Sequence, residues 1–157
     1  GKSGMYEGNY LLSNEAIRGK LSQYVPLGAL TDLESRLKCE LSKSVSSVYK
    51  GYLGVDMMIC RFALLPVFRI HPCVEINLRM NMGLVSRLIY DRYVQSGASG
   101  VFRVSYYPSD GQALQEHNAM KAGHPLHTEE GRVVKGYLPL VPVLKTSRYR
   151  AYILVED

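Results

Sequence analysis

The sequence is poor in cysteine and has no long apolar run and no common phosphate-binding signature. Its three cysteines, Cys39, Cys60 and Cys73, form no C-x-x-C pair, which argues against a disulfide framework and a zinc knuckle. Such sparse cysteine favours a reducing compartment, most simply the cytoplasm. No apolar run reaches about 18 residues, the length that a transmembrane helix needs. Neither a P-loop nor a G-x-G-x-x-G pattern occurs, so neither glycine-rich phosphate site is expected.

The composition is that of a globular domain. Of the 157 residues, 46% are hydrophobic and 21% are charged, which is enough for a real core and predicts one domain, at most with an appendage. The first five residues lack the apolar stretch of a signal peptide and resemble a cloning remnant or a linker. The 19 basic and 14 acidic residues give a net charge of +5, a weak indication of anionic partners. Because no Lys/Arg run occurs, we expect neither nucleic acid nor a membrane as a partner.

Hydrophobic periodicity predicts alternating helices and strands. A capping box at Thr31 and Glu34 opens the clearest helix, and the remaining elements follow from apolar spacing and from turn residues. These patterns predict an α+β fold in which an antiparallel sheet carries flanking helices. The predicted helices are 14–25, 31–48, 83–97 and 109–122, and the predicted strands are 54–62, 67–78, 101–107, 133–144 and 149–155.

Polar side chains interrupt the two middle strands in a regular way. Asp56 lies within an apolar strand, where a carboxylate is costly unless it is paired or binds a metal. On the next strand, Glu75, Asn77 and Arg79 follow at every second position, so their side chains share one face and the apolar residues between them point to the other.

A hairpin that turns near Leu65 and Pro66 would place Asp56 opposite Glu75. Directly opposed Cβ atoms lie about 4.5–5.5 Å apart, and two carboxylates at that distance repel each other. A divalent cation would remove the repulsion, and two carboxylates with an amide oxygen suit Mg²⁺ or Mn²⁺. Arg79 would add a fixed cation for phosphate or carboxylate oxygens. The combination indicates phosphoryl transfer, in which the protein positions groups and neutralises charge.

The segment Gly-Val-Asp at 54–56, followed by Glu-Ile-Asn-Leu-Arg at 75–79, resembles the C-terminal metal- and nucleotide-binding half of ATP-grasp enzymes. These include D-alanine–D-alanine ligase and biotin carboxylase, and the Glu-x-Asn-x-Arg spacing is most similar to the biotin carboxylase version. The resemblance covers about 50–83. It implies an ATP-grasp C-terminal subdomain in which Asp56, Glu75 and Asn77 hold magnesium against ATP phosphates.

In that resemblance, Arg79 contacts the nucleotide and stabilises the transferred phosphoryl group. The reaction joins a small carboxylate to an amine or similar nucleophile through an acyl-phosphate. Asn81, Met82 and Gly83 could frame the acceptor pocket at the start of a helix.

The sequence departs from the family because only 55 residues precede Asp56, too few for the other ATP-grasp half, which supplies a lysine pair and a glycine-rich loop. We therefore expect residues 6–100 to be the ATP-grasp C-terminal part of a larger ligase. Residues 101–157 would be a family-specific extension packed on the same domain. The isolated chain would bind nucleotide weakly and lack catalysis without the N-terminal half of the same polypeptide.

The alternative is a non-catalytic binding or scaffold module. Its basis is the positive charge together with 12 tyrosines, notably at 106–107 and 148–150, which could bind a protein or RNA, although sheet packing explains them more simply. His124 and His127 have the spacing of a metal-binding pair, but an exposed loop is the simpler interpretation because no third ligand is evident.

Overall fold

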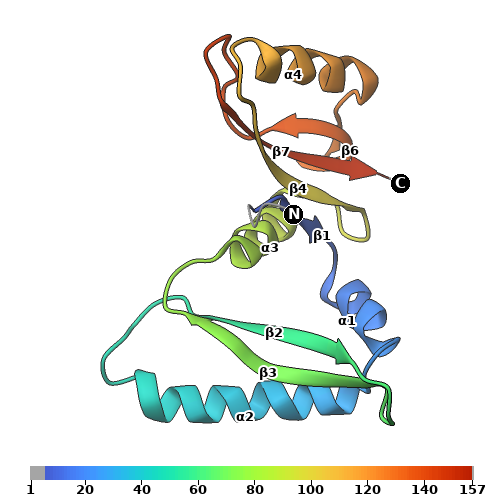
Figure 1. Ribbon diagram of the computed structural model, residues 1–157. Coiled ribbons are helices and arrows are strands. Elements are labelled where there is room, and N and C mark those ends of the chain that lie inside the picture. The colour runs from blue at the N-terminus through green and yellow to red at the C-terminus, as the bar shows by residue number, and fades with distance from the viewer. Residues whose placement is uncertain (1–5, 157) are drawn as a thin grey trace. The chain divides into compact units, whose positions relative to one another are not determined.

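The structure, a computed structural model, describes residues 6–156 and has four helices and seven strands in that range (Figure 1). The described range includes no part of the predicted remnant at 1–5. In chain order the elements are β1 (Gly8–Leu11), α1 (Asn14–Ser22), α2 (Leu27–Val45), β2 (Gly54–Arg61), β3 (Phe68–Asn77), α3 (Met82–Tyr93), β4 (Ser99–Tyr106), α4 (Gln112–Gly123), β5 (His127–Glu129), β6 (Arg132–Pro139) and β7 (Tyr149–Glu156).

The expected fold class is confirmed at the level of an α+β chain with an antiparallel sheet and flanking helices. All nine predicted elements are present, with shifted ends. The short strands β1 and β5 were not predicted, because three or four residues carry too little periodicity. Among the described residues, no helix combines the length and the apolar character that crossing a bilayer requires.

The predicted start of the second helix is wrong. Helix α2 begins at Leu27, directly after Pro26, which has φ −59° and ψ 135° and serves as its N-cap residue. The hydroxyl of Thr31 therefore does not cap the helix but donates back to the Leu27 carbonyl at 3.1 Å, inside the first turns. Glu34 pairs with Arg18 of α1 instead of completing a capping box. The fourth predicted helix also starts later, with Gly111 as its N-cap residue.

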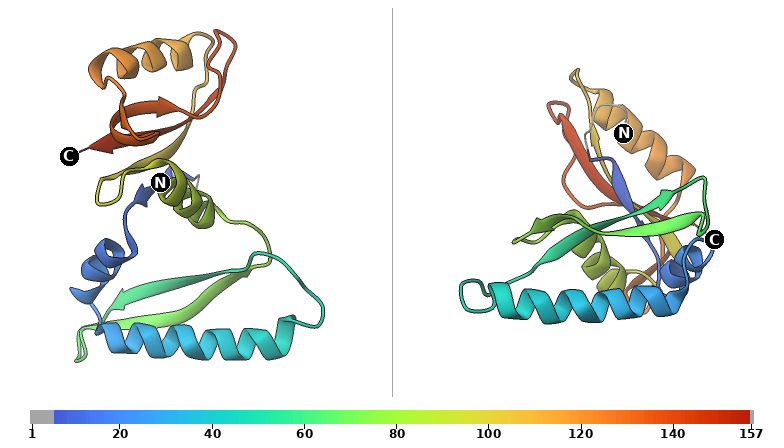
Figure 2. Two further views of the ribbon diagram at one scale, coloured as in Figure 1. Left: turned by 180° about the vertical axis from the view of Figure 1, so that it is seen from behind. Right: turned by 60° about the horizontal axis from the view of Figure 1, so that its bottom comes forward.

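The chain divides into two compact units. One contains residues 14–84, and the other joins 85–156 to the described residues before 14. The first unit consists of α1, α2 and the antiparallel hairpin of β2 and β3, and two views show α2 running along one face of the hairpin (Figures 1 and 2). The predicted boundary between the ATP-grasp part at 6–100 and the extension at 101–157 is a boundary of function and stays a prediction.

The hairpin unit has a thin core. Its α2 stripe, from Leu33 through Leu37 and Leu41, is only half-buried, and the sole fully buried apolar residues of the unit's described part are Val25 and Leu30. Large apolar side chains stay exposed at the tip of the hairpin, where Leu64 and Leu65 keep 75% and 84% of their surface. The α1–α2 connection contacts the hairpin through the Tyr24 and Phe68 rings, whose centroids lie 5.1 Å apart.

The second unit is built on a five-stranded sheet in the order β1-β4-β7-β6-β5, with every neighbouring pair antiparallel. It holds most of the buried apolar side chains, which are Leu11, Tyr90, Val94, Phe102, Tyr107, Ala113, Val133, Tyr137, Ile153 and Val155. Strand β6 pairs with β5 through residues 132–135 and with β7 through residues 136–139, so its proline end has a strand partner on one side only within the described sheet. Pro139 is tolerated there because it is the last residue of the strand.

Candidate metal centre on the β2–β3 hairpin

The strand pairing of the hairpin brings the predicted carboxylates together. In the register of β2 and β3, Gly54 faces Asn77, Val55 faces Ile76, and Asp56 faces Glu75. The opposition of Asp56 and Glu75 that the sequence predicts is therefore confirmed. Because residues that face each other across a ladder share a face, Asp56, Glu75 and Asn77 all project from the same side of the hairpin.

A β-bulge produces this register. The next pair toward the tip is Met58 with His71, so β3 has two more residues than β2 between the two pairs. The surplus lies in the segment around Pro72, which has no N–H to donate to a ladder and is therefore suited to a bulge. If the pairing seen near the hairpin tip continued without the bulge, Cys73 rather than Glu75 would lie opposite Asp56.

The three side chains differ in exposure. Asp56 and Glu75 are exposed, whereas Asn77 keeps 7% of its surface and is one of the few buried polar residues. The Asn77 Nδ2 donates a hydrogen bond of 3.4 Å to Asp56 Oδ2. With Nδ2 turned to the aspartate, the Asn77 Oδ1 accepts no hydrogen bond within residues 6–156 and is available to a cation.

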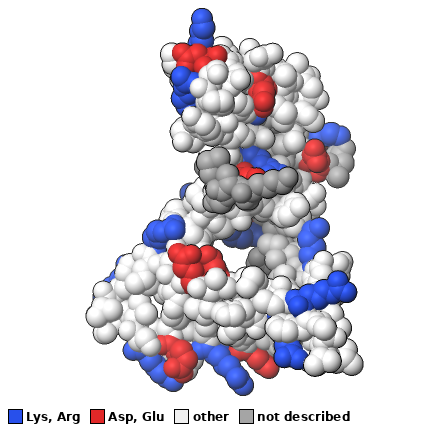
Figure 3. All heavy atoms as spheres, in the orientation of Figure 1, with Lys and Arg blue, Asp and Glu red and all other residues white. Residues whose placement is uncertain are grey.

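The electrostatics of this face favour a bound cation. Neither Asp56 nor Glu75 has an ion-pair partner in the part of the chain that the structure describes, although they face each other across the ladder. Figure 3 shows exposed acidic and basic side chains interspersed on the part of the molecule that carries the hairpin. Like charges directly opposite each other destabilise a strand pair, and a divalent ion would reverse the sign of that contribution.

The donor set fits a hard cation with incomplete protein ligation. Two carboxylates and one amide oxygen are ligands that Mg²⁺ and Mn²⁺ accept, with water or substrate phosphates completing the shell. Within residues 6–156 no three His, Cys, Asp or Glu side chains gather in a way that could hold a metal ion. The hairpin thus offers a partial site rather than a closed cage.

Arg79 lies close to this site along the chain, but it does not contact the site residues. It lies two residues beyond the end of β3, is exposed, and has no hydrogen bond or ion pair with other described residues. An exposed guanidinium with no protein partner is available to an anionic ligand. The structure does not join Arg79 to the carboxylates directly.

Sequence reasoning placed Asn81 at the start of a helix but missed its contact with Gly54. The Asn81 Oδ1 accepts a hydrogen bond of 2.9 Å from the Leu84 N–H, so Asn81 caps α3. Its Nδ2 lies against Gly54, where an added Cβ would approach it to 2.0 Å. An asparagine directly before a helical pattern was a usable N-cap signal, whereas nothing in the sequence indicates the contact with Gly54.

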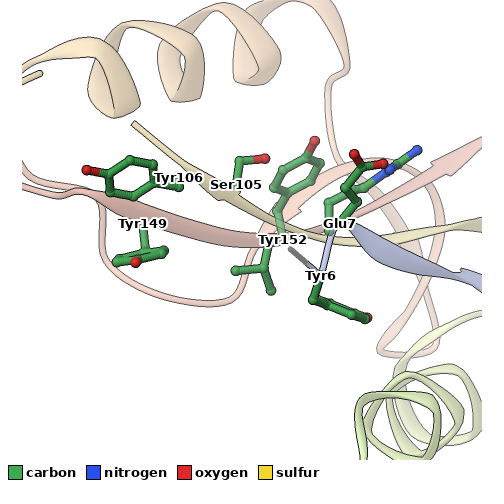
Figure 4. Close-up of a pocket in the computed structure, with 8 residues that line it drawn as sticks. Tyr6, Glu7, Ser105, Tyr106, Tyr149 and Tyr152 are labelled. Atoms are coloured by element: carbon green, nitrogen blue, oxygen red, sulfur yellow. The ribbon is translucent and has the colours of Figure 1, made fainter. Parts of the chain in front are cut away.

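The second unit contains an open groove of about 680 Å³ at β4 and β7. Tyr106 and Tyr149 face each other across the ladder with ring centroids 5.1 Å apart, and both are exposed. Burial raises the pKa of Tyr6, and the positive charge of Arg103 partly offsets that rise. In Figure 4, Ser105, Tyr152 and Glu7 extend to one side of the strands and Tyr6 to the other. The groove is lined by Tyr6, Glu7, Arg103, Val104, Ser105, Tyr106, Tyr149 and Tyr152.

Of the other tyrosine and arginine candidates, Tyr107 and Arg150 are buried, whereas Arg148 is exposed and pairs with Asp110. Arg150 keeps 2% of its surface, and its Nη2 donates to the Tyr107 hydroxyl at 2.7 Å and to Glu116 Oε2 at 3.0 Å. Its guanidinium carbon also lies 4.6 Å from the Tyr152 ring centroid, a cation–π distance. Burial and the hydrogen bond to Glu116 raise the pKa of Tyr107. These residues form a structural cluster rather than an open site.

The histidine pair of the segment 123–132 lies on the surface of the second unit. His127 is exposed and its Nε2 contacts Glu129 Oε1 at 3.3 Å, while His124 is exposed at the C-terminal end of α4. Residues His127–Glu129 of this segment form strand β5, so the expected loop is wrong for that part, whereas the expected exposure of both histidines is confirmed.

Comparison of the chain with protein-family models, with curated proteins and with solved structures found no match in any of the three. The site must therefore be interpreted from its own residues.

Proposed function

We propose that this chain is the C-terminal, metal- and nucleotide-binding part of an ATP-grasp ligase. The observation that carries the proposal is the strand register, in which Asp56 faces Glu75 and the Asn77 amide completes the same polar face. The Glu-x-Asn-x-Arg spacing at 75–79 supports it as a resemblance of sequence. The hairpin beside α2 is compatible with an ATP-grasp C-terminal subdomain.

In this proposal, Asp56, Glu75 and Asn77 hold one or two Mg²⁺ ions against the β- and γ-phosphates of ATP. The metal, or Mn²⁺ in its place, would neutralise phosphate charge when bound. Arg79 binds the transferred phosphoryl group. Its guanidinium provides a planar set of donors that matches phosphoryl oxygens.

The proposed parent reaction has two steps. A carboxylate oxygen of a small substrate attacks the γ-phosphorus, and ADP leaves. An amine or similar nucleophile then attacks the acyl carbon, and inorganic phosphate leaves. Asn81 and the start of α3 frame the acceptor side in this proposal. Because the lysine pair and glycine-rich loop belong to the family's other half, we propose that the isolated chain binds nucleotide weakly and does not catalyse.

NMR titration with Mg-ATP tests this function. Amide shifts should appear first in 54–58 and 73–83, and Asp56→Asn should remove them. Titration with ATP and excess chelator should also remove them, because the phosphates would then lack their bridging cation. Shifts confined to other regions, or none at millimolar ligand, would contradict a nucleotide site on this hairpin.

A non-catalytic binding module is the second candidate, and the open tyrosine groove favours it. Exposed tyrosines beside Arg103 offer stacking and a positive charge to a protein or RNA segment. Electrostatic binding of this kind weakens steeply with salt. Binding that falls with salt and is lost in Tyr149→Ala, while Asp56→Asn has no effect, would favour this candidate.

A further inference from the structure

Asn77 is buried on a face whose other members are exposed. Asp56 and Glu75 lie open to solvent beside it. The residue opposite Asn77 is Gly54, which has no side chain and so cannot provide this cover. The low exposure of the Asn77 side chain therefore depends on other neighbouring groups.

The amide of Asn81 occupies the space above Gly54. A Cβ at residue 54 would lie 2.0 Å from Asn81 Nδ2, too close for a real contact, and 3.1 Å from its Cγ, which is tight. That Cβ would point to the same face as the Asn77 side chain, because the two residues are ladder partners. The Asn81 amide thus fills the position that a side chain opposite Asn77 would take.

Asn81 is itself held in place. Its Oδ1 accepts the Leu84 N–H at 2.9 Å, so the first turn of α3 fixes the orientation of the amide plane. With the Oδ1 engaged in this cap, the Nδ2 is the atom directed at Gly54. The cap and the glycine together determine where the amide can lie.

We infer that Asn81 is a positioning residue for the candidate metal centre. The Asn81 side chain lies on Gly54 and is fixed by the helix cap, so it restricts the orientation of the Asn77 side chain. In that orientation the Asn77 Nδ2 donates to Asp56 and the Asn77 Oδ1 is left to bind a hard divalent cation. This inference rests on the proposed function. Residues that orient metal ligands typically change metal affinity by about 10–100-fold when they are removed.

The test measures Mn²⁺ affinity of the full chain by the EPR signal of free Mn²⁺. Gly54→Ala displaces the Asn81 amide and should weaken Mn²⁺ binding by about tenfold. Asn81→Ser keeps a side chain that can cap α3 but removes the amide, and it should weaken binding to a similar extent with little change in Tm. Gly28→Ala is the matched control, because nothing lies within 4 Å of a Cβ at that position, and its affinity should equal that of the wild type.

The double variant Gly54→Ala with Asn81→Ser separates positioning from general damage. If Gly54 acts through Asn81, the double variant binds Mn²⁺ no more weakly than Asn81→Ser alone, because coupled residues are not additive. Wild-type affinity in Gly54→Ala, or losses that multiply in the double variant, would overturn the inference while leaving the metal centre intact. Wild-type affinity in Asp56→Asn, or no Mn²⁺ binding by the wild type, would overturn the metal centre and the inference with it.

Discussion

In the five-stranded sheet unit the guanidinium of Arg150 is enclosed, whereas in the hairpin unit the carboxylates of Asp56 and Glu75 are left open and face each other. The Nη2 of the buried arginine donates to Glu116 and to the Tyr107 hydroxyl, and its guanidinium lies over the Tyr152 ring, while its Nε and Nη1 have no hydrogen-bond partner among the described residues. Among the described residues, the only hydrogen-bond partner of the hairpin carboxylates is the Asn77 amide, which donates to Asp56. Burial requires compensation within the protein, while exposed like charges can await an external ion. The charge of Arg150 therefore contributes to folding, whereas the charges of Asp56 and Glu75 are open to a ligand.

Removal of Glu116 should have the largest effect. Glu116→Ala leaves Arg150 buried without its counter-charge and should lower the free energy of unfolding by about 2–3 kcal/mol, less than for a fully enclosed pair because the Glu116 side chain is 58% exposed. Urea unfolding monitored by tyrosine fluorescence checks this, since the chain has no tryptophan. Asp110→Ala, which breaks the exposed pair with Arg148, is the control and should cost less than about 1 kcal/mol. Equal costs for the two variants would contradict the contrast between buried and exposed charge.

Asp56→Asn should act in the opposite sense. The loss of one of two opposed carboxylates relieves repulsion and should raise the free energy of unfolding by up to about 0.5 kcal/mol in metal-free buffer. The same variant should weaken Mn²⁺ binding by about tenfold or more, equivalent to about 1.4 kcal/mol. Chemical denaturation with and without Mn²⁺ measures both effects. A destabilised metal-free variant would mean that Asp56 serves the fold.

His117 gives the sheet unit a dependence on pH. Burial lowers its pKa, and the positive charges of Lys121 and Arg150 add to the effect. Its Nδ1 lies 3.0 Å from the Tyr137 hydroxyl. Because the unfolded state binds the proton more readily, the stabilisation is fully present above the ordinary histidine pKa and is lost as the pH falls below it. Unfolding of wild type and His117→Gln between pH 8 and about pH 5 should show a smaller loss for the variant; parallel curves would contradict this role.

Thr31→Ala should have the smallest effect. Its hydroxyl donates to the Leu27 carbonyl within α2, so the change should alter the free energy of unfolding by less than about 0.5 kcal/mol. A capping residue would cost about 1 kcal/mol, which is the loss expected for Asn81→Ala at α3. Thermal unfolding of the two variants compares them directly, and a larger loss for Thr31→Ala would contradict this ranking and indicate that its contacts with Leu27 and Arg18 stabilise the fold more than the α3 cap does.

Much of the secondary structure could be predicted because it follows from local periodicity. The apolar runs around Asp56 and Glu75 have the length and alternation of strands, and β2 and β3 begin and end within one residue of the predicted ranges. The start of α2 could not be predicted as reliably, because Pro26 and Thr31 both offer a plausible beginning. Sheet packing was the simpler interpretation of Tyr107 by sequence, whereas the burial of Arg150 could not be predicted, since it depends on α4 and on the Tyr152 ring.

The sequence by itself determined which residues share the polar face, because successive strand side chains alternate in direction whatever the neighbouring strand does. Only the tertiary structure decided which of them meet. The bulge around Pro72 moves the pairing by two residues, which preserves the face and brings Glu75 rather than Cys73 to Asp56. The seating of Asn81 on Gly54 likewise depends on the fold, since it requires α3 to begin beside β2. Hydrophobic periodicity and composition are local properties of the chain. Strand register and the packing of Asn81 on Gly54 depend on contacts between segments that are distant in sequence.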